Sequence, residues 1–258
     1  MSGAERASRA DRITSPPSTP GVPTGEALGL IATSDMELLG LMPGASNYTF
    51  LARLTGSAGT EVLVVYKPRA GEAPLWDFPE GTLCQREVAA FVLAGALGWP
   101  PVPPTTLRDG PHGPGSVQLF IHADFDQHFF TLRQAHADRF RAVAAFDVIA
   151  NNADRKGGHC LLDEGGTIWV IDHGVCFSSD PKLRSVIWDF AGQRLPEPLL
   201  EDVARVAGEL RSGPLRERLL ALLAEQEVDA AAARAERLAR SATYPNPVGD
   251  RPYPWPPV

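Results

Sequence analysis

Three short stretches that are rich in apolar residues follow one another in the first half of the chain. These stretches are residues 36–42, 47–54 and 60–67, and the segments PGAS and TGSAG between them are rich in turn-forming residues. Short apolar runs bounded by turn signals are typical of strands. The pattern therefore predicts a meander of three strands.

One helix and two further strands complete the prediction for the first half. Thr82 is a residue type that caps helices, and a helix from there through Gly95 places most of its apolar residues near one stripe. Short strands are expected in residues 101–108 and 115–121. The apolar stripe consists of Leu83, Val88, Phe91, Val92 and Ala96.

The hydrophobic pattern changes to a helical period after His122. Residues 131–152 predict a long helix whose apolar side carries one charged residue, Asp147. Two short strands, 159–163 and 167–172, follow with the turn DEGG between them, and this pattern predicts a hairpin. Further helices are expected near residues 198–211, 214–224 and 226–241.

These patterns predict an α+β chain organised in four segments. Residues 1–26 hold almost no large apolar side chains, so we expect a disordered leader. A β-rich N-lobe is expected over residues 27–121 and a helical C-lobe over residues 122–243. Residues 244–258 form a tail with Pro at six of its 15 positions, which excludes helix and favours extended polyproline conformations. The Tyr and Trp side chains of this tail are candidates for docking on the body.

Charge and composition exclude several classes of function. The formal net charge is −7 and no run of five Lys or Arg residues occurs, so no footprint for nucleic acid is visible. The chain lacks the apolar core of a signal peptide and the run of roughly 18 apolar residues of a membrane span, so we expect a cytoplasmic protein without integral membrane association. Cys84, Cys160 and Cys176 form no C-x-x-C pair, and we expect reduced thiols that pack in the core.

Asp154 and Asp172 are the first candidates for chemistry. Each lies where a regular element meets a loop, and the predicted hairpin between them would return the chain to the same edge. Two carboxylates at the same edge can bind a divalent cation and act as a general base. Either aspartate taken alone would more often be a turn residue or a helix cap, so the interpretation depends on the residues around them.

Five motifs give this pair of aspartates a context. They are GASNYTF (44–50), VVYKPR (64–69), GSVQLFI (115–121), NNADRKGGH (151–159) and IDHGVCF (171–177). Over roughly residues 36–242, the chain resembles the phosphatidylinositol 3/4-kinase-like branch of the kinase superfamily, and is most similar to the type II phosphatidylinositol 4-kinases and to uncharacterised actinobacterial kinase-like proteins. The motifs are similar to that family's glycine-containing loop, Lys-Pro strand end, hinge, Asp-Arg catalytic loop and Asp-x-Gly metal motif.

The resemblance implies a bilobal protein-kinase-like fold and a role for each residue that matches the two aspartate motifs. Asp154 would be the catalytic aspartate that orients a substrate hydroxyl. Arg155 beside it would order the loop or neutralise phosphate. Asp172 would be the main ligand of Mg²⁺, with His159 as a second candidate metal ligand.

The same resemblance assigns the ATP-binding residues of the first half. Lys67 would hold the phosphates of ATP, and Glu87 would pair with Lys67. Ser46 and Asn47 lie in the glycine-containing loop, where small residues let backbone N–H groups approach phosphates. Adenine would meet the backbone of four hinge residues, which are Gln118, Leu119, Phe120 and Ile121.

Two features depart from the family pattern. His159 stands where the family has Asn, and imidazole favours Mn²⁺ or other transition metals over the hard Mg²⁺ ion, so we expect Mg²⁺ with Mn²⁺ as an alternative. The chain also lacks the cysteine-rich insertion of the membrane-bound type II lipid kinases. The resemblance therefore does not imply lipid specificity.

Two other interpretations stay open beside the kinase. His159, Cys160, His173 and Cys176 are all zinc-ligand types, but neighbours on a strand point to opposite faces, so His159 and Cys160 should not share a metal. A catalytically weak, nucleotide-sensing pseudokinase module would use the same site, and His159 is the feature that favours it. The main prediction is an ATP-dependent phosphotransferase that acts on a hydroxyl of a small molecule, lipid or protein.

Overall fold

The computed structural model describes residues 24–44, 47–56 and 59–258. The chain folds into two compact units. The first comprises residues up to Cys84 together with Pro104–Phe120, and the second comprises Gln85–Pro103 and Ile121–Val258. Most of the expected disordered leader, residues 1–23, lies outside the described residues.

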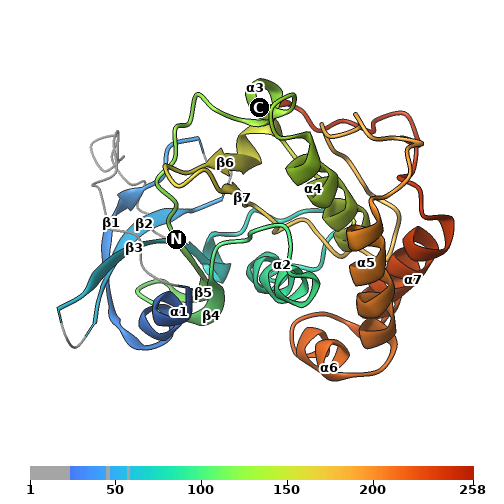
Figure 1. Cartoon of the computed structure of the whole chain (residues 1–258). Coiled ribbons are helices and arrows are strands. Elements are labelled where there is room, and N and C mark those ends of the chain that lie inside the picture. The colour runs from blue at the N-terminus through green and yellow to red at the C-terminus, as the bar shows by residue number, and fades with distance from the viewer. Residues whose placement is uncertain (1–23, 45–46, 57–58) are drawn as a thin grey trace. The chain divides into compact units, whose positions relative to one another are not determined.

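The first unit contains an antiparallel sheet of five strands in the order β1-β2-β3-β5-β4 (Figure 1). The predicted meander of three strands is confirmed. The strand expected over 101–108 begins only at Thr105, because three of the four preceding residues are prolines, which have no backbone N–H to donate to a sheet. The strands are β1 (Asp35–Leu41), β2 (Phe50–Thr55), β3 (Glu61–Pro68), β4 (Thr105–Gly110) and β5 (Gly113–Leu119).

A helix that the sequence pattern did not predict, α1 (Thr24–Thr33), packs on one face of this sheet (Figure 1). Its Ile31 joins a core cluster with Val64 and other residues that alternate along the strands. The opposite face of β3 carries Leu63, which belongs to a second cluster, and by the same alternation it carries Lys67. The helix α1 therefore covers the face of the sheet that does not carry Lys67.

The helix α2 (Leu83–Leu97) begins on a cap that comes from the loop before it. The Glu72 carboxylate accepts the backbone N–H groups of Leu83 at 3.1 Å and Cys84 at 2.8 Å. Thr82, which we expected to cap this helix, donates its hydroxyl to the carbonyl of Pro79 at 2.7 Å. The negative charge of Glu72 at the helix N-terminus is also favourable for the helix dipole.

The second unit holds most of the helices and one small hairpin. The three late helices and the hairpin agree with the predicted ranges, and none of the described helices is both long and apolar enough to cross a bilayer. The elements are α3 (Phe129–Leu132), α4 (Ala137–Ala150), a 3₁₀ turn η3 (Gly157–His159), β6 (Cys160–Leu162), β7 (Ile168–Val170), α5 (Glu197–Arg211), α6 (Pro214–Leu220) and α7 (Glu225–Ser241).

The single helix expected over 131–152 is two helices, α3 and α4, with a turn between them. The rings of Phe129 and Phe140 pack edge to face with centroids 5.0 Å apart, and both side chains are fully buried. In one continuous helix these two residues would lie about 16 Å apart along the axis. The break therefore lets both rings enter the same core.

Asn151 ends α4 in the left-handed region, with φ 53°. Its side-chain N–H₂ group donates to the carbonyls of Ser178 and Asp180, at 2.9 and 2.7 Å, and its Oδ1 accepts the N–H of Lys182 at 3.0 Å. Asn tolerates this backbone conformation better than most residues. Asn151 thus fixes the direction in which the chain leaves α4 toward Asp154.

Candidate functional site

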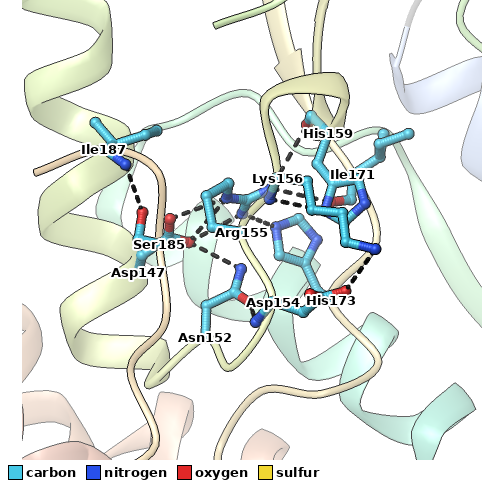
Figure 2. A network of polar contacts seen from close by, with 10 residues as sticks. All are labelled: Asp147, Asn152, Asp154, Arg155, Lys156, His159, Ile171, His173, Ser185 and Ile187. Carbon is cyan, nitrogen blue, oxygen red and sulfur yellow. Dashed lines mark hydrogen bonds and ion pairs between the residues drawn. The ribbon is translucent and has the colours of Figure 1, made fainter. Parts of the chain in front are cut away.

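A buried ion pair lies at the centre of the candidate site (Figure 2). Asp147 on α4 is 1% exposed, and Arg155 in the following loop has no exposed surface. Arg155 Nε and Nη2 each lie 2.9 Å from a different carboxylate oxygen of Asp147. Burial alone would lower the pKa of Arg155, but the Asp147 carboxylate outweighs it and raises the pKa above its ordinary value. The one charged residue on the apolar side of the predicted helix is therefore the counter-charge of Arg155.

The rest of the Arg155 guanidinium binds the segment that follows the hairpin (Figure 2). Nη1 donates to the carbonyl of Ile171 at 3.0 Å, and Nη2 lies 2.8 Å from His173 Nε2. Because arginine only donates, His173 Nε2 must accept, and its ring proton must reside on Nδ1. Arg155 thus ties the Asp154 loop to the Asp172 loop. Since Arg155 is fully buried, we infer that it orders the loop and does not contact phosphate.

Asp154 is held in place through its neighbour Asn152. Asn152 Oδ1 accepts the N–H of Asp154 at 2.9 Å, and its Nδ2 donates to Asp147 at 3.0 Å. Burial raises the pKa of the Asp154 carboxyl; Lys156, whose Nζ lies 3.4 Å away, opposes the increase, and the charge of Asp172 adds to it. A carboxylate with a raised pKa is a better proton acceptor.

Asp172 lies at the end of the hairpin in a strained backbone conformation, with φ 63°. Its side chain is 49% exposed, and its Oδ2 lies 3.2 Å from His159 Nε2. His159 Nδ1 faces the N–H of Lys156 at 3.4 Å, so the ring proton belongs on Nε2 and is donated to Asp172. A non-glycine residue at positive φ is typical of sites where the surrounding structure imposes the conformation for function.

The donor atoms in this region fit a hard divalent cation. Asp172 offers an exposed carboxylate, and Asp154 is near enough for the charge of Asp172 to raise its pKa. Within the described residues, no group of three or more His, Cys, Asp or Glu side chains could hold a metal alone. Mg²⁺ and Mn²⁺ are commonly bound by one or two carboxylates together with substrate phosphates, and Asp154 and Asp172 offer carboxylates.

The three cysteines are reduced thiols that pack in the core, as expected. Cys160 and Cys176 are free and fully buried, and Cys84 is free and 2% exposed. Burial raises the pKa of the Cys160 thiol to about 12 and that of Cys176 well above its ordinary value. Free cysteines in such surroundings behave as small hydrophobic residues.

Two adjacent residues of α2 bind the backbone of the Asp172 loop. The Glu87 carboxylate accepts the N–H of His173 at 2.9 Å. Arg86, 1% exposed, donates to the carbonyl of Cys176 at 2.7 Å and to Glu227 of α7 at 2.6 Å. The sequence prediction missed Arg86. Its position three residues after Leu83 and four before Ala90, inside the apolar stripe, is the signal that could have found it.

Two of the predicted nucleotide-binding residues, Lys67 and Asn47, are described in the first unit before the hinge. Lys67 lies on β3 directly opposite Ser116 of β5. Asn47 Oδ1 accepts the N–H of Ala73 at 2.8 Å, so the Asn47 side chain holds the loop that follows β3. Ser46 lies outside the described residues.

The predicted hinge is partly occupied by sheet hydrogen bonds. The N–H of Leu119 donates to Pro104 and that of Phe120 donates to Leu63, both at 2.9 Å. Gln118 Nε2 donates to Thr105 Oγ1 at 2.8 Å. Any adenine contact at the hinge must therefore use other backbone groups of the segment. Ile121 belongs to the second unit, and the pairing of Lys67 with Glu87 stays a prediction.

Comparison with known proteins places this site in a context. No protein-family model matches the chain. Protein Rv2133c of Mycobacterium tuberculosis (strain ATCC 25618 / H37Rv) is 39% identical to this chain, in an alignment that covers 88% of this chain and 94% of that protein. The chain belongs to the family of this mycobacterial protein.

Solved structures identify the fold of this family member. The Golgi casein kinase with Mn/ADP bound aligns over 88% of this chain and 80% of its own, with a TM-score of 0.53 and 15% identity. Hydra Fam20 with sugar aligns over 85% and 87%, with a TM-score of 0.51 and 14% identity. The fold is α+β and protein-kinase-like, as predicted, with a β-rich first lobe and a helical second lobe. The finer resemblance to phosphatidylinositol 3/4-kinases stays a prediction.

Proposed function

We propose that this protein is an ATP-dependent phosphotransferase that moves the γ-phosphate of ATP to a hydroxyl group. One observation carries the proposal: two carboxylates with different environments flank the same hairpin on loops held together by the buried Arg155. The Asp154 side chain is 33% exposed and has a raised pKa, whereas the Asp172 side chain is 49% exposed. This difference suits Asp154 as a proton acceptor and Asp172 as a metal ligand.

In this proposal each residue of the second unit acts through its observed environment. Asp154 accepts a hydrogen bond from the attacking hydroxyl and orients it, and Lys156 beside it balances negative charge. Asp172 would hold Mg²⁺ or Mn²⁺, which would neutralise charge on the phosphates. His159 can join it as a ligand only in the other tautomer, because its Nε2 carries the proton that is donated to Asp172. Arg155 keeps the two loops in register, so that positioning and electrostatic stabilisation provide the rate enhancement.

The nucleotide itself is assigned to residues of the first unit and the hinge. Lys67, on the face of the sheet that α1 leaves uncovered, binds the α and β phosphates. Glu87 supports Lys67 with the carboxylate that also accepts the His173 N–H. The loop of Ser46 and Asn47 approaches the phosphates. Adenine contacts the backbone of the segment from Gln118 to Ile121.

The decisive experiment measures ATP turnover and autophosphorylation of the purified protein with Mg²⁺ and with Mn²⁺. We expect Asp154→Asn to reduce turnover by roughly 10²–10⁴-fold, the usual contribution of a positioned proton acceptor. Asp172→Asn should reduce it similarly and should also weaken the dependence on metal concentration. Asp180→Asn is the matched control, because Asp180 is exposed and contributes only its carbonyl to Asn151. Equal turnover in all three variants would refute the proposal.

A second candidate function is a nucleotide sensor that binds ATP without turning it over. The hydrogen bond from His159 to Asp172 favours it, because the ring satisfies an oxygen that an active kinase would give to the metal. In this case Mn²⁺ with ATP raises the melting temperature while no phosphate is transferred. The variant His159→Asn separates the two functions: it should create or increase turnover if this hydrogen bond limits metal binding.

The acceptor is proposed only as a class, a hydroxyl of a small molecule, a lipid or a protein. Residues 176–190, which follow the Asp172 motif, contain two cations, Lys182 and Arg184. These are too few to indicate binding to an anionic membrane surface. A transfer screen with labelled ATP over the three acceptor classes would identify the class. Labelling that Asp154→Asn abolishes counts as transfer by this site.

A further inference from the structure

The Pro-rich segment of residues 244–258, called the strap below, starts from a fixed point on the second unit. Tyr244 is 3% exposed, and its hydroxyl donates to the carbonyl of Arg141 at 2.9 Å. Its backbone exchanges two hydrogen bonds of 3.0 Å with Gln193 and Gly192. Figure 1 shows the strap in red from the end of α7 to a point beside α3. The residues beyond Tyr244 are therefore tethered to the body of this unit.

Two carbonyl groups of the strap are anchored by donors of the same unit. The Pro252 carbonyl accepts two hydrogen bonds, from the N–H of Ser185 at 3.0 Å and from Trp188 Nε1 at 3.1 Å. Five residues later, the Pro257 carbonyl accepts the N–H of Gly157 at 2.8 Å. Indole N–H groups that donate to carbonyls of an extended, proline-rich chain are typical of polyproline recognition.

The first anchor touches the backbone that supports the Asp154 loop. Arg155 pairs in parallel with residues next to Ser185: its N–H donates to Arg184 at 3.0 Å, and its carbonyl accepts the N–H of Val186 at 3.1 Å. The N–H of Ser185 points to the other side, where Pro252 accepts it. The segment around Ser185 is thus held between the catalytic-loop candidate and the strap.

The second anchor lies in the Asp154 loop itself and requires a glycine there. A Cβ on Gly157 would lie 2.9 Å from the ring of Phe130, which is too close for undisturbed packing, and 3.4 Å from the Pro257 carbonyl oxygen, the near limit of ordinary contact. A Cβ on Gly158 would meet only Val258 Cγ1, at an ordinary 3.8 Å. The close packing of Phe130 is therefore what requires a glycine at the second anchor.

Backbone groups hold the strap, and its large outer side chains contribute little burial. Trp255 is 88% exposed and Tyr253 is 56% exposed, so of the aromatic residues that were candidates for docking only Tyr244 is buried. The strap binds the N–H of Gly157 in the Asp154 loop at one point, and at the other it binds the segment of Ser185 and Trp188, which pairs with Arg155. Tyr244 and Pro254 are buried, but both anchors are carbonyl groups, so the strap restrains this loop through hydrogen bonds.

We propose that the strap is a positioning element that holds the loop of residues 154–159 in its working conformation. Gly157 and Trp188 are the positioning contacts, because they donate hydrogen bonds to the carbonyls of Pro257 and Pro252. Binding of the strap stands on the observed hydrogen bonds alone. Its effect on phosphate transfer rests on the proposed function.

The test uses the full chain and perturbs one anchor while the other is observed. Trp188→Phe keeps a ring but removes the indole donor, and Gly157→Ala pushes against the ring of Phe130 beside the second anchor. NMR-detected hydrogen exchange reports the Gly157 amide in the first variant and the Ser185 amide in the second. We expect each observed amide to exchange roughly fivefold to tenfold faster, the effect of losing about one hydrogen bond. Gly158→Ala is the matched control and should leave both amides protected.

An unchanged exchange rate of the amide at the distant anchor in both variants would overturn the proposal for the strap. The positioning role has its own readout in the turnover assay. Trp188→Phe and Gly157→Ala should lower kcat while KM for ATP stays constant, because the loop carries Asp154 and not the nucleotide contacts. A released strap with unchanged kcat would overturn that role. A wild-type protein without turnover would refute the proposed function and leave the exchange experiment as a separate test of the strap.

Discussion

A carboxylate and a guanidinium that are both removed from water depend on each other. Asp147 and Arg155 are 1% and 0% exposed, and removal of either would leave the other charge unpaired. We expect Arg155→Met to lower the free energy of unfolding by about 3–5 kcal/mol, the usual effect of breaking a buried pair. Urea denaturation, followed by tryptophan fluorescence, measures the difference.

The control for this prediction is an ion pair at the surface. Arg133 and Asp189 lie 3.3 Å apart with side chains 45% and 35% exposed. Arg133→Met should change the free energy of unfolding by about 1 kcal/mol or less. If the two methionine variants were destabilised equally, the buried pair would not have the structural role assigned to it here.

The titration of two aspartates should affect stability with opposite signs. Burial raises the pKa of Asp154, so the charged carboxylate is less favourable in the folded than in the unfolded protein. The contribution of Asp154 to stability is therefore present at low pH and is lost as pH rises through the pKa of the folded protein. Hydrogen bonds from Arg205 and then Trp99 lower the pKa of Asp202, so its contribution is present above the ordinary value and is lost as pH falls.

These signs give a measurable contrast between two isosteric variants. At neutral pH without metal, Asp154→Asn should melt at a higher temperature than the wild type, and Asp202→Asn at a lower temperature. Both differences should shrink as pH falls toward and below the ordinary aspartate value of 3.8. Thermal unfolding in EDTA between pH 3 and pH 7 checks this. A lower melting temperature for Asp154→Asn at neutral pH would contradict the assigned environment.

Among the elements, the β6–β7 hairpin sets the distance between the two candidate loops. Its turn depends on Asp163, whose carboxylate accepts the N–H of Thr167 and the indole N–H of Trp169, both at 2.7 Å. We expect Asp163→Ala to cost about 1–3 kcal/mol of stability, because two donors lose their acceptor. The same variant should increase hydrogen exchange over Cys160–Val170. Glu164→Ala, at the exposed neighbouring position, should do neither.

The elements also show where sequence patterns stop being informative. Short apolar runs between turn signals and helical periodicity predicted the meander, the hairpin and the three late helices, because each depends on contacts near in sequence. The pattern gave no sign of α1, whose two glycines and short apolar run do not differ from a loop. The cap by Glu72 could not be predicted either, since it reaches α2 from 11 residues away.

At the scale of the whole molecule, the sequence named candidate residues but not their long-range partners. The motifs and the family resemblance proposed Asp154, Asp172 and Glu87, whose roles stay a prediction, whereas the position of Arg86 depends on a bond to Glu227, 141 residues away. Asp147 was visible in the sequence as a charged residue in an apolar stripe, but its partner, Arg155, could be identified only from the structure. Long-range partners of buried charges leave no local signal, because many pairings are compatible with the same sequence pattern.

Nucleotide and metal should bind with positive coupling if the proposed function is correct. Under that function Lys67 and Asp172 act on one nucleotide, so Mn²⁺ should increase the affinity for ADP, and ADP should increase that for Mn²⁺ by the same factor. Ligand at 100 times its Kd should raise the free energy of unfolding by about 2.7 kcal/mol. Thermal shifts with ADP, Mn²⁺ and both together measure this coupling.

Two variants identify which residue transmits the coupling. Asp172→Asn should keep the small shift caused by ADP alone but lose the additional shift caused by Mn²⁺, because the carboxylate that links metal and phosphates is gone. Lys67→Met should reduce the shift with ADP alone and with both ligands. Asp180→Asn, away from the candidate loops, should behave as the wild type. If Mn²⁺ and ADP produced strictly additive shifts in the wild-type protein, a shared nucleotide–metal site would be refuted, because one ligand that contacts the other must change its affinity.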